Sequence, residues 1–156
     1  MLQCIDLFEN SLQIRLPNDF TDMSPDSIRI MFPNEMHPQV IKGSPDGSYA
    51  TFSLLEKSLS RQQLFSATYS ALSLLQRFYP SCDNQIVHVI QLEEGDCGWF
   101  SYLHMDMKNI LFIAAITNKM VLGSCGCAMN DQRRFEELKI AISSLKTSTL
   151  HEDAHC

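Results

Sequence analysis

The segment from residue 86 to residue 128 constrains the fold most, because it holds four strand-like runs separated by very short turns. Connections between parallel strands need a dozen or more residues, so turns of this length force an antiparallel meander. Residues 110–116 are apolar at every position, which is typical of a central strand covered on both faces. The four predicted strands are 86–93, 99–105, 110–117 and 120–128.

Alternating apolar residues predict further strands before the meander. Leu12, Ile14 and Leu16 alternate with polar residues and end at Pro17, and Ile28, Ile30 and Phe32 repeat the pattern over 28–32. Residues 39–42 and 48–56 flank the sequence Gly-Ser-Pro-Asp-Gly at 43–47, whose proline and glycines favour a tight turn. This segment predicts a hairpin.

Two helices are predicted by capping and periodicity. Ser60 followed by Gln63 fits a capping box, apolar residues then recur at helical spacing, and Pro80 ends the pattern, so we expect a helix over 61–78. A second helix is predicted over 131–146, where a narrow apolar stripe is formed by Phe135, Leu138, Ile142 and Leu145.

These elements predict an α+β domain. An antiparallel sheet of about six to eight strands, ending in the four-strand meander, is sandwiched by two main helices. The chain of 156 residues is long enough to bury a stable core without disulfides or metals. We expect residues 1–146 to form one domain and residues 147–156 a flexible polar tail.

Charge and hydropathy exclude two classes of partner. The chain carries 12 Lys and Arg against 18 Asp and Glu, a net charge of −6 with no basic run, so no nucleic acid is expected. The longest apolar run has seven residues, far short of the roughly 20 that a membrane-spanning helix needs. Asp6 and Glu9 interrupt the first ten residues, which differs from a secretory signal and favours a cytoplasmic location.

Cysteines offer the first route to chemistry. Cys125 and Cys127 would share one strand face, and Cys97 begins a neighbouring strand, so the three are candidate ligands for a metal or redox site. A cytoplasmic chain keeps its thiols reduced, and free cysteine is among the most buried residue types. We therefore favour buried thiols, and expect no metal and no cofactor.

Histidines and carboxylates offer the second route. His88 and His104 fall on predicted strands joined by one hairpin turn, so they are candidate neighbours for acid–base catalysis with Glu93, Glu94 and Asp96. No nucleophile motif or metalloprotease motif accompanies them. The sequence thus favours a chain without catalysis, and a small-ligand enzyme remains an alternative.

Aromatic residues and methionines of the late meander suggest a contact surface. Phe100, Tyr102 and His104 share one strand face, and Met107 follows them. Aromatic side chains dominate binding hot spots, and methionine-rich surfaces adapt to apolar segments. We predict that these four residues bind a protein partner through one sheet face or edge.

The layout resembles one known family. The run Leu12-Gln-Ile-Arg-Leu-Pro-Asn-Asp-Phe20 is similar to the first strand of PsbP-like proteins, and the following hairpin, helix, meander and last helix agree over about residues 8–145. The resemblance implies a three-layer sandwich. Its members include a photosystem extrinsic subunit, a Ran-binding nuclear import factor and bacterial adaptor chaperones of type VI secretion. It therefore implies a binding or adaptor protein, and it transfers no functional residue.

Overall fold

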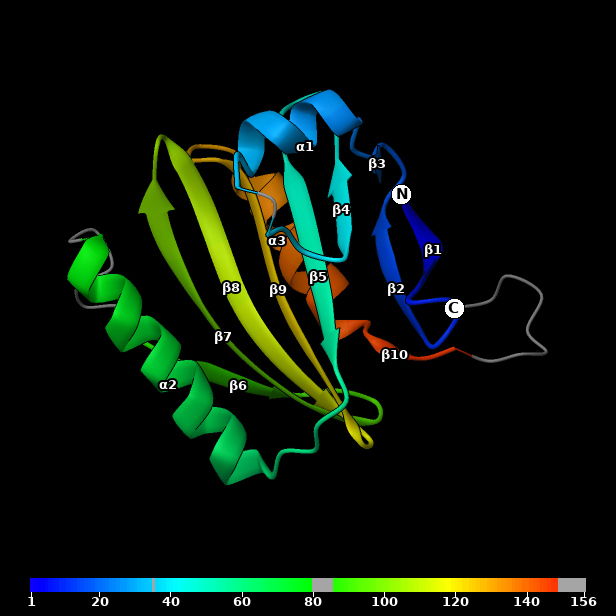
Figure 1. Ribbon diagram of the computed structural model, residues 1–156, viewed down its shortest axis with the longest axis vertical. Coiled ribbons are helices and arrows are strands. Elements are labelled where there is room, and N and C mark those ends of the chain that lie inside the picture. Colours follow the sequence, from blue (N-terminus) through cyan, green and yellow to red (C-terminus); the bar gives the residue numbers. More distant parts are fainter. Residues whose placement is uncertain (35, 80–85, 149–156) are drawn as a thin grey trace.

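A computed structural model describes residues 1–34, 36–79 and 86–148. The described residues form two antiparallel sheets and three helices (Figure 1). The elements are β1 (Leu2–Leu7), β2 (Leu12–Pro17), β3 (Thr21–Asp22), α1 (Pro25–Met31), β4 (Val40–Gly43), β5 (Tyr49–Leu55), α2 (Arg61–Phe78), β6 (His88–Gln91), β7 (Gly95–His104), β8 (Met107–Ile116), β9 (Lys119–Ala128), α3 (Gln132–Ser143) and β10 (Lys146–Thr147).

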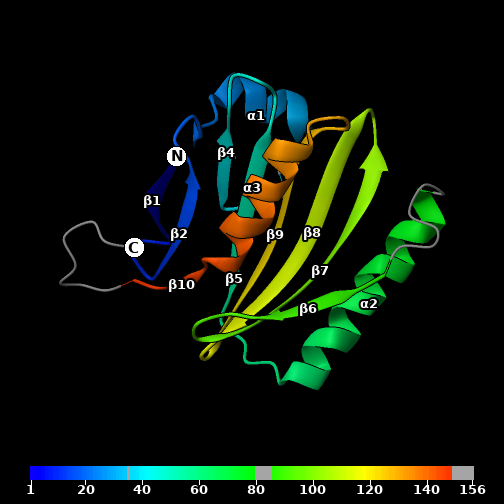
Figure 2. The ribbon, with the colours of Figure 1, turned by 180° about the vertical axis from the view of Figure 1, so that it is seen from behind.

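The main sheet has seven strands in the order β3-β4-β5-β9-β8-β7-β6. Its two faces are covered by different helices, with α2 over β7 and β8 on one side and α3 on the other (Figures 1 and 2). Leu64 and Leu72 anchor α2, whereas Phe135 and Leu138 anchor α3 in the larger core. The predicted α+β sandwich with two main helices is confirmed.

The predicted meander is also confirmed. β7 pairs with β8 from Gly95↔Ile116 to His104↔Met107, and β8 pairs with β9 from Ile116↔Lys119 to Met107↔Ala128. The β7–β8 turn lies two residues earlier than predicted, because β8 already begins at Met107. The residues of that turn are Met105 and Asp106, both of which adopt a left-handed backbone with φ of 52° and 61°. Such turns usually contain glycine, so the sequence carries no strong signal for this one.

Residues 28–32 form no strand, and that prediction is wrong. They lie in α1 and at its end, where the backbone of Phe32 donates to the carbonyl of Ile28. Ser24 caps the helix by accepting from the backbone of Ser27, Pro25 occupies the first turn, and Asp26 follows. These helix-start signals override a short apolar alternation.

The seven-stranded sheet agrees with the expected number of strands, but a second sheet of three strands, β1-β2-β10, lies beside it, so the strands do not form one continuous sheet. β1 has no counterpart among the predicted strands, and β10 extends into the first residue of the expected tail, where the backbone of Ser148 also donates to the carbonyl of Ser11 at 3.1 Å. Residues 149–156 lie outside the described residues. The small sheet packs on α3 through β2 and extends the core on that side.

Both main helices begin as their capping residues predict. Ser60 and Gln63 form the reciprocal capping box, with distances of 3.1 Å and 2.8 Å, and α2 covers the expected residues 61–78. Asp131 caps α3, which ends at Ser143, three residues earlier than predicted. Among the described helices, none is long and apolar enough to cross a membrane.

Candidate functional site

The three candidate ligand cysteines are buried in the core. Cys97, Cys125 and Cys127 are free thiols with exposed fractions of 0%, 3% and 0%. Burial raises the pKa of each thiol above its ordinary value, so all three stay protonated at neutral pH. Because the thiolate is the metal ligand and the nucleophile, these thiols are poorly suited to either role. Within the described ranges, no group of three or more His, Cys, Asp or Glu residues could hold a metal ion.

Cys4 behaves differently from these three, because it is disulfide-bonded. This finding contradicts the expectation that every thiol is reduced. That expectation followed from the compartment alone, which says nothing about cysteines that the fold brings together. Cys82 and Cys156 lie outside the described residues.

The two candidate histidines are not neighbours. His88 stacks on Trp99 with ring centroids 4.3 Å apart, whereas His104 packs against Tyr79 at 4.4 Å. Positions 99 and 104 are an odd number of residues apart on β7, so the two histidines lie on opposite faces of the sheet. The expected proximity is wrong, because the register of β6 decides it.

The candidate carboxylates each have a structural partner. Glu94 accepts from the backbone of Thr147 at 3.0 Å, and Asp96 pairs with Arg61 at 3.1 Å. Glu93 lies 3.8 Å from the amine of Lys146. These pairs hold the start of β7 against β10 and α2, and they leave no acid–base pair beside His88 or His104.

The predicted contact residues are split between the core and the surface. Phe100 is fully buried beneath Leu72 of α2, so it belongs to the core. Tyr102 stacks on Tyr79 with centroids 6.3 Å apart. His104 is exposed and Met107 is half-buried. These side chains lie on the α2 side of the sheet, at the end of the β7–β8 hairpin.

A cavity of about 330 Å³ lies at the same end of the β7–β8 hairpin, on the face of the sheet that is turned toward α3. Leu103 and Lys108 face each other across β7 and β8, so both side chains line it from one face of the sheet. Its lining consists of Ser101, Tyr102, Leu103, Lys108 and Met129. We call these five residues, together with Met105 at the turn, the hairpin surface.

Three apolar side chains of the hairpin surface face solvent. The exposed fractions are 40% for Leu103, 80% for Met105 and 50% for Met129. The backbone beneath them is fixed, because the N–H of Met129 donates to the carbonyl of Asp106 at 3.1 Å. Two successive left-handed residues other than glycine cost free energy and persist only where neighbouring contacts impose them. The site therefore combines exposed apolar area with a rigid frame.

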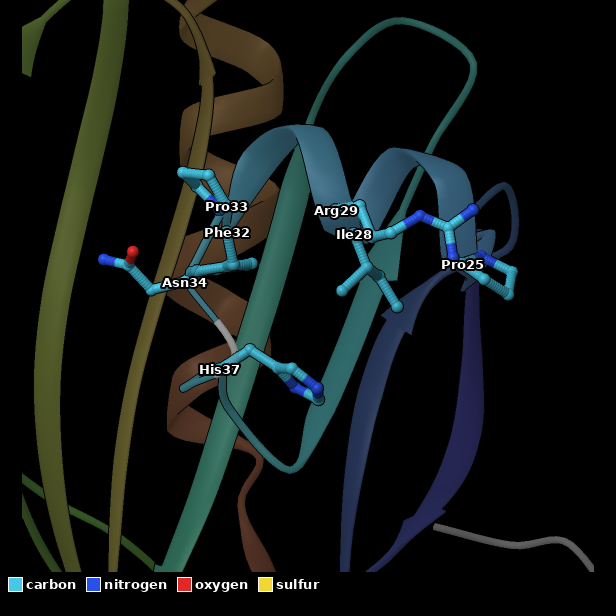
Figure 3. Close-up of a pocket in the computed structure, with 7 residues that line it drawn as sticks. All are labelled: Pro25, Ile28, Arg29, Phe32, Pro33, Asn34 and His37. Carbon is cyan, nitrogen blue, oxygen red and sulfur yellow. The ribbon is translucent and has the colours of Figure 1, made fainter.

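A second open region surrounds α1, which has no buried residue. A cavity of about 540 Å³ lies between this helix and the loop that follows it (Figure 3). Ile28 points from α1 toward the loop that carries His37, and Arg29 extends along the helix toward Pro25. We call this region the α1 pocket, lined by Pro25, Ile28, Arg29, Phe32, Pro33, Asn34 and His37.

The basic groups of the α1 pocket already have partners. Arg29 pairs with Asp26 one turn earlier in α1, and Nδ1 of His37 lies 2.8 Å from the carbonyl oxygen of Pro38. Sequence reasoning missed this pocket because it placed a strand at 28–32. The signal that could have found it is the run Ser24-Pro25-Asp26, which is typical of a helix start.

Comparison with known proteins identifies the fold. No family model matches the chain, and no curated protein matches it. Among solved structures, cyanobacterial PsbP from Synechocystis sp. PCC 6803 has a TM-score of 0.59 at 10% identity, covering 94% of this chain and 92% of that protein. A protein from Bacteroides thetaiotaomicron has a TM-score of 0.55 at 12% identity over 96% of this chain. This chain spans 50% of the length of the Bacteroides protein.

These likenesses show the fold alone. The expected resemblance to PsbP-like proteins is confirmed at the level of architecture, because the match with cyanobacterial PsbP extends over nearly the whole of both chains. At identities of 10% and 12%, no functional residue is transferred from either structure.

Proposed function

We propose that this PsbP-like domain is a non-catalytic binding module that engages a segment of another protein through the hairpin surface. The observation that carries the proposal is the exposure of Leu103, Met105 and Met129 around one cavity at the end of a rigid hairpin. Exposed apolar side chains that gather in this way are typical of contact surfaces, whereas single exposed apolar residues are ordinary.

Two further features support a peptide-like ligand at this place. Methionine side chains adapt to differently shaped apolar partners; Met129 lines the cavity, and the exposed Met105 lies at the turn between β7 and β8. The ring of Tyr102, stacked on Tyr79, and the exposed ring of His104 lie on the α2 side of the same turn. Met107, which pairs with His104 across the turn, completes the set on the α2 side. An adaptor role follows if the bound segment belongs to a larger assembly.

The proposal is tested by selecting random twelve-residue peptides from a display library on the immobilised protein. The enriched peptides are then measured by calorimetry against a Leu103→Ser/Met129→Ser variant. We expect at least a tenfold weaker affinity, because removing two buried apolar contacts at a hot spot costs more than about 1.4 kcal/mol.

The matched control is an Ile30→Ser/Met36→Ser variant, which also removes two exposed apolar side chains but beside α1. It should bind the same peptides as tightly as the unchanged protein. Circular dichroism establishes that both variants fold. Selection of no peptide, or equal binding by the Leu103→Ser/Met129→Ser variant, would contradict the proposal.

A further inference from the structure

Lys108 is the basic residue of the hairpin surface, and it forms no ion pair with a carboxylate in the described part of the chain. Its side chain is half-buried and lines the cavity, with Nζ 3.9 Å from the ring centroid of Phe135. Among the described residues, no ion pair includes Lys108. The ring of Phe135 is the partner of its ammonium group.

This environment differs from that of an ordinary surface lysine. An exposed ammonium is fully hydrated and needs no protein partner, as for the exposed Lys57. Lys108 gives up part of its hydration, and a contact with an aromatic face recovers on the order of 1 kcal/mol. Partial burial of a charge is more favourable when an opposite charge is present, so the cavity is suited to an anion.

The acidic groups at the start of α3 are engaged elsewhere. Asp131 accepts from the backbone of Arg134 as the helix cap, and Glu136 pairs with Lys139 at 3.4 Å. Asp106 is exposed at the turn, two positions before Lys108, and the ion pairs of the described residues include none between the two. Among the described residues, no carboxylate therefore forms an ion pair with Lys108.

The cavity also has the components needed to hold a carboxylate beside an apolar group. Ser101 brings a hydroxyl donor to the same lining as Lys108, and Leu103 and Met129 form apolar walls next to them. A carboxylate that met the ammonium would lie directly beside these walls. The ligand that fits has one acidic group flanked by an apolar side chain.

We infer that the hairpin surface recognises an acidic residue, Asp or Glu, next to an apolar residue in the partner's segment, with Lys108 as the residue that binds the carboxylate. The inference rests on the proposed function and names the chemistry of the partner. It commits to a protein segment because the apolar walls and the exposed methionines extend beyond the cavity itself.

The test uses the peptides selected on the unchanged protein and a double-mutant cycle. Peptides should be enriched in Asp or Glu adjacent to an apolar residue. Changing that residue to Asn or Gln should weaken binding to the unchanged protein about tenfold. The same peptide change should have no effect on Lys108→Met, whose affinity for the original peptide is already about tenfold lower.

Lys119→Met is the matched control. Lys119 is also half-buried on the meander and forms no ion pair with a described residue, but it lines neither of the two cavities. It removes the same charge from the chain, so it reports general electrostatics, and its affinity should change less than twofold. Should Lys108→Met fold poorly, Lys108→Gln and the peptide substitution alone supply the same comparison.

The outcomes separate the inference from the proposed function. Enriched peptides without an acidic residue, or a peptide substitution that has the same effect on Lys108→Met as on the unchanged protein, would overturn the inference and leave the binding module standing. Enrichment of no peptide at all would overturn both.

Discussion

The hairpin surface and the α1 pocket both expose apolar side chains, but they differ in how firmly the backbone beneath them is held and in whether their basic residues are paired. The hairpin surface lies mainly on β7 and β8, whose backbones pair with each other along their full lengths; α2 packs on one face, and Lys108 contacts Phe135 of α3 on the other. α1 has no buried residue, and both basic groups in its pocket have partners within the same segment. The comparison teaches that exposed apolar area alone identifies neither region as a binding site. The hairpin surface differs by its fully paired strands and by Lys108, which forms no ion pair with any residue that the structure describes.

The largest expected difference between the two regions is in local stability. Amides of α1 should exchange with solvent at least about a hundredfold faster than ladder amides of β8 such as Ile110, because opening α1 exposes little buried surface. Native-state hydrogen exchange followed by NMR measures this ratio. Equal protection of α1 and β8 would remove the contrast on which the comparison depends.

A smaller effect is expected at Arg134, which joins α3 to the loops on the α1 side of the molecule. Its guanidinium pairs with Asp19 and with Asp46, and it lies 5.0 Å from the ring of Phe20. Arg134→Met should lower the free energy of unfolding by about 2 kcal/mol, less than a fully buried pair would lose because both carboxylates are half-exposed.

Urea unfolding measures this loss, with Lys42→Met as the control, because Lys42 pairs with the highly exposed Asp22 and such a pair contributes little. Peptide binding at the hairpin surface should be unchanged in Arg134→Met, since Phe135 and not Arg134 contacts Lys108. If peptide affinity fell in proportion to the free energy of unfolding, the structure of the hairpin surface would depend on the contacts of Arg134, contrary to this account.

The smallest expected effect is the acid response of Asp46. Burial raises the pKa of this carboxyl, but hydrogen bonds from Ser44, Ser48 and Arg134 outweigh it and hold the pKa well below its ordinary value. Because the folded pKa is the lower one, the stabilisation is present above about pH 4 and is lost as the pH falls toward the folded value. Asp46→Asn should therefore lose stability at pH 7 and show a flatter decline below pH 4.

Thermal unfolding across this pH range checks the acid response. Asp22→Asn is a suitable control, since Asp22 is highly exposed and pairs with Lys42 on the neighbouring strand. Its stability should follow that of the unchanged protein. A decline for Asp46→Asn as steep as that of the unchanged protein would contradict the assignment.

Local patterns predicted the elements that local chemistry determines. The capping box at Ser60 set the start of α2, and the short turns between 86 and 128 required the meander. Within α1 (Pro25–Met31), the apolar residues Ile28 and Ile30 alternate as they would in a strand, whereas Ser24 and Pro25 are typical of a helix start. In this segment, the helix-capping signal and not the apolar alternation determines the secondary structure.

The candidate site depended on relations that no local pattern contains. Phe100 and Leu103 are three positions apart, yet one is in the core and the other faces solvent. The register of β6 separates His88 from His104, and the contact between Lys108 and Phe135 joins β8 to α3. Each of these relations depends on tertiary packing, because packing determines the strand face that a helix covers.

The most direct test of the central claim uses the methionine methyl groups as reporters of the bound peptide. Protein labelled at these methyl groups is titrated with the tightest selected peptide and followed by NMR. The account predicts that the signals of Met105 and Met129 move, while those of Met31 and Met36 beside α1 stay in place. Movement of Met31 and Met36 with Met105 and Met129 unchanged would place the binding surface at α1 and contradict the account.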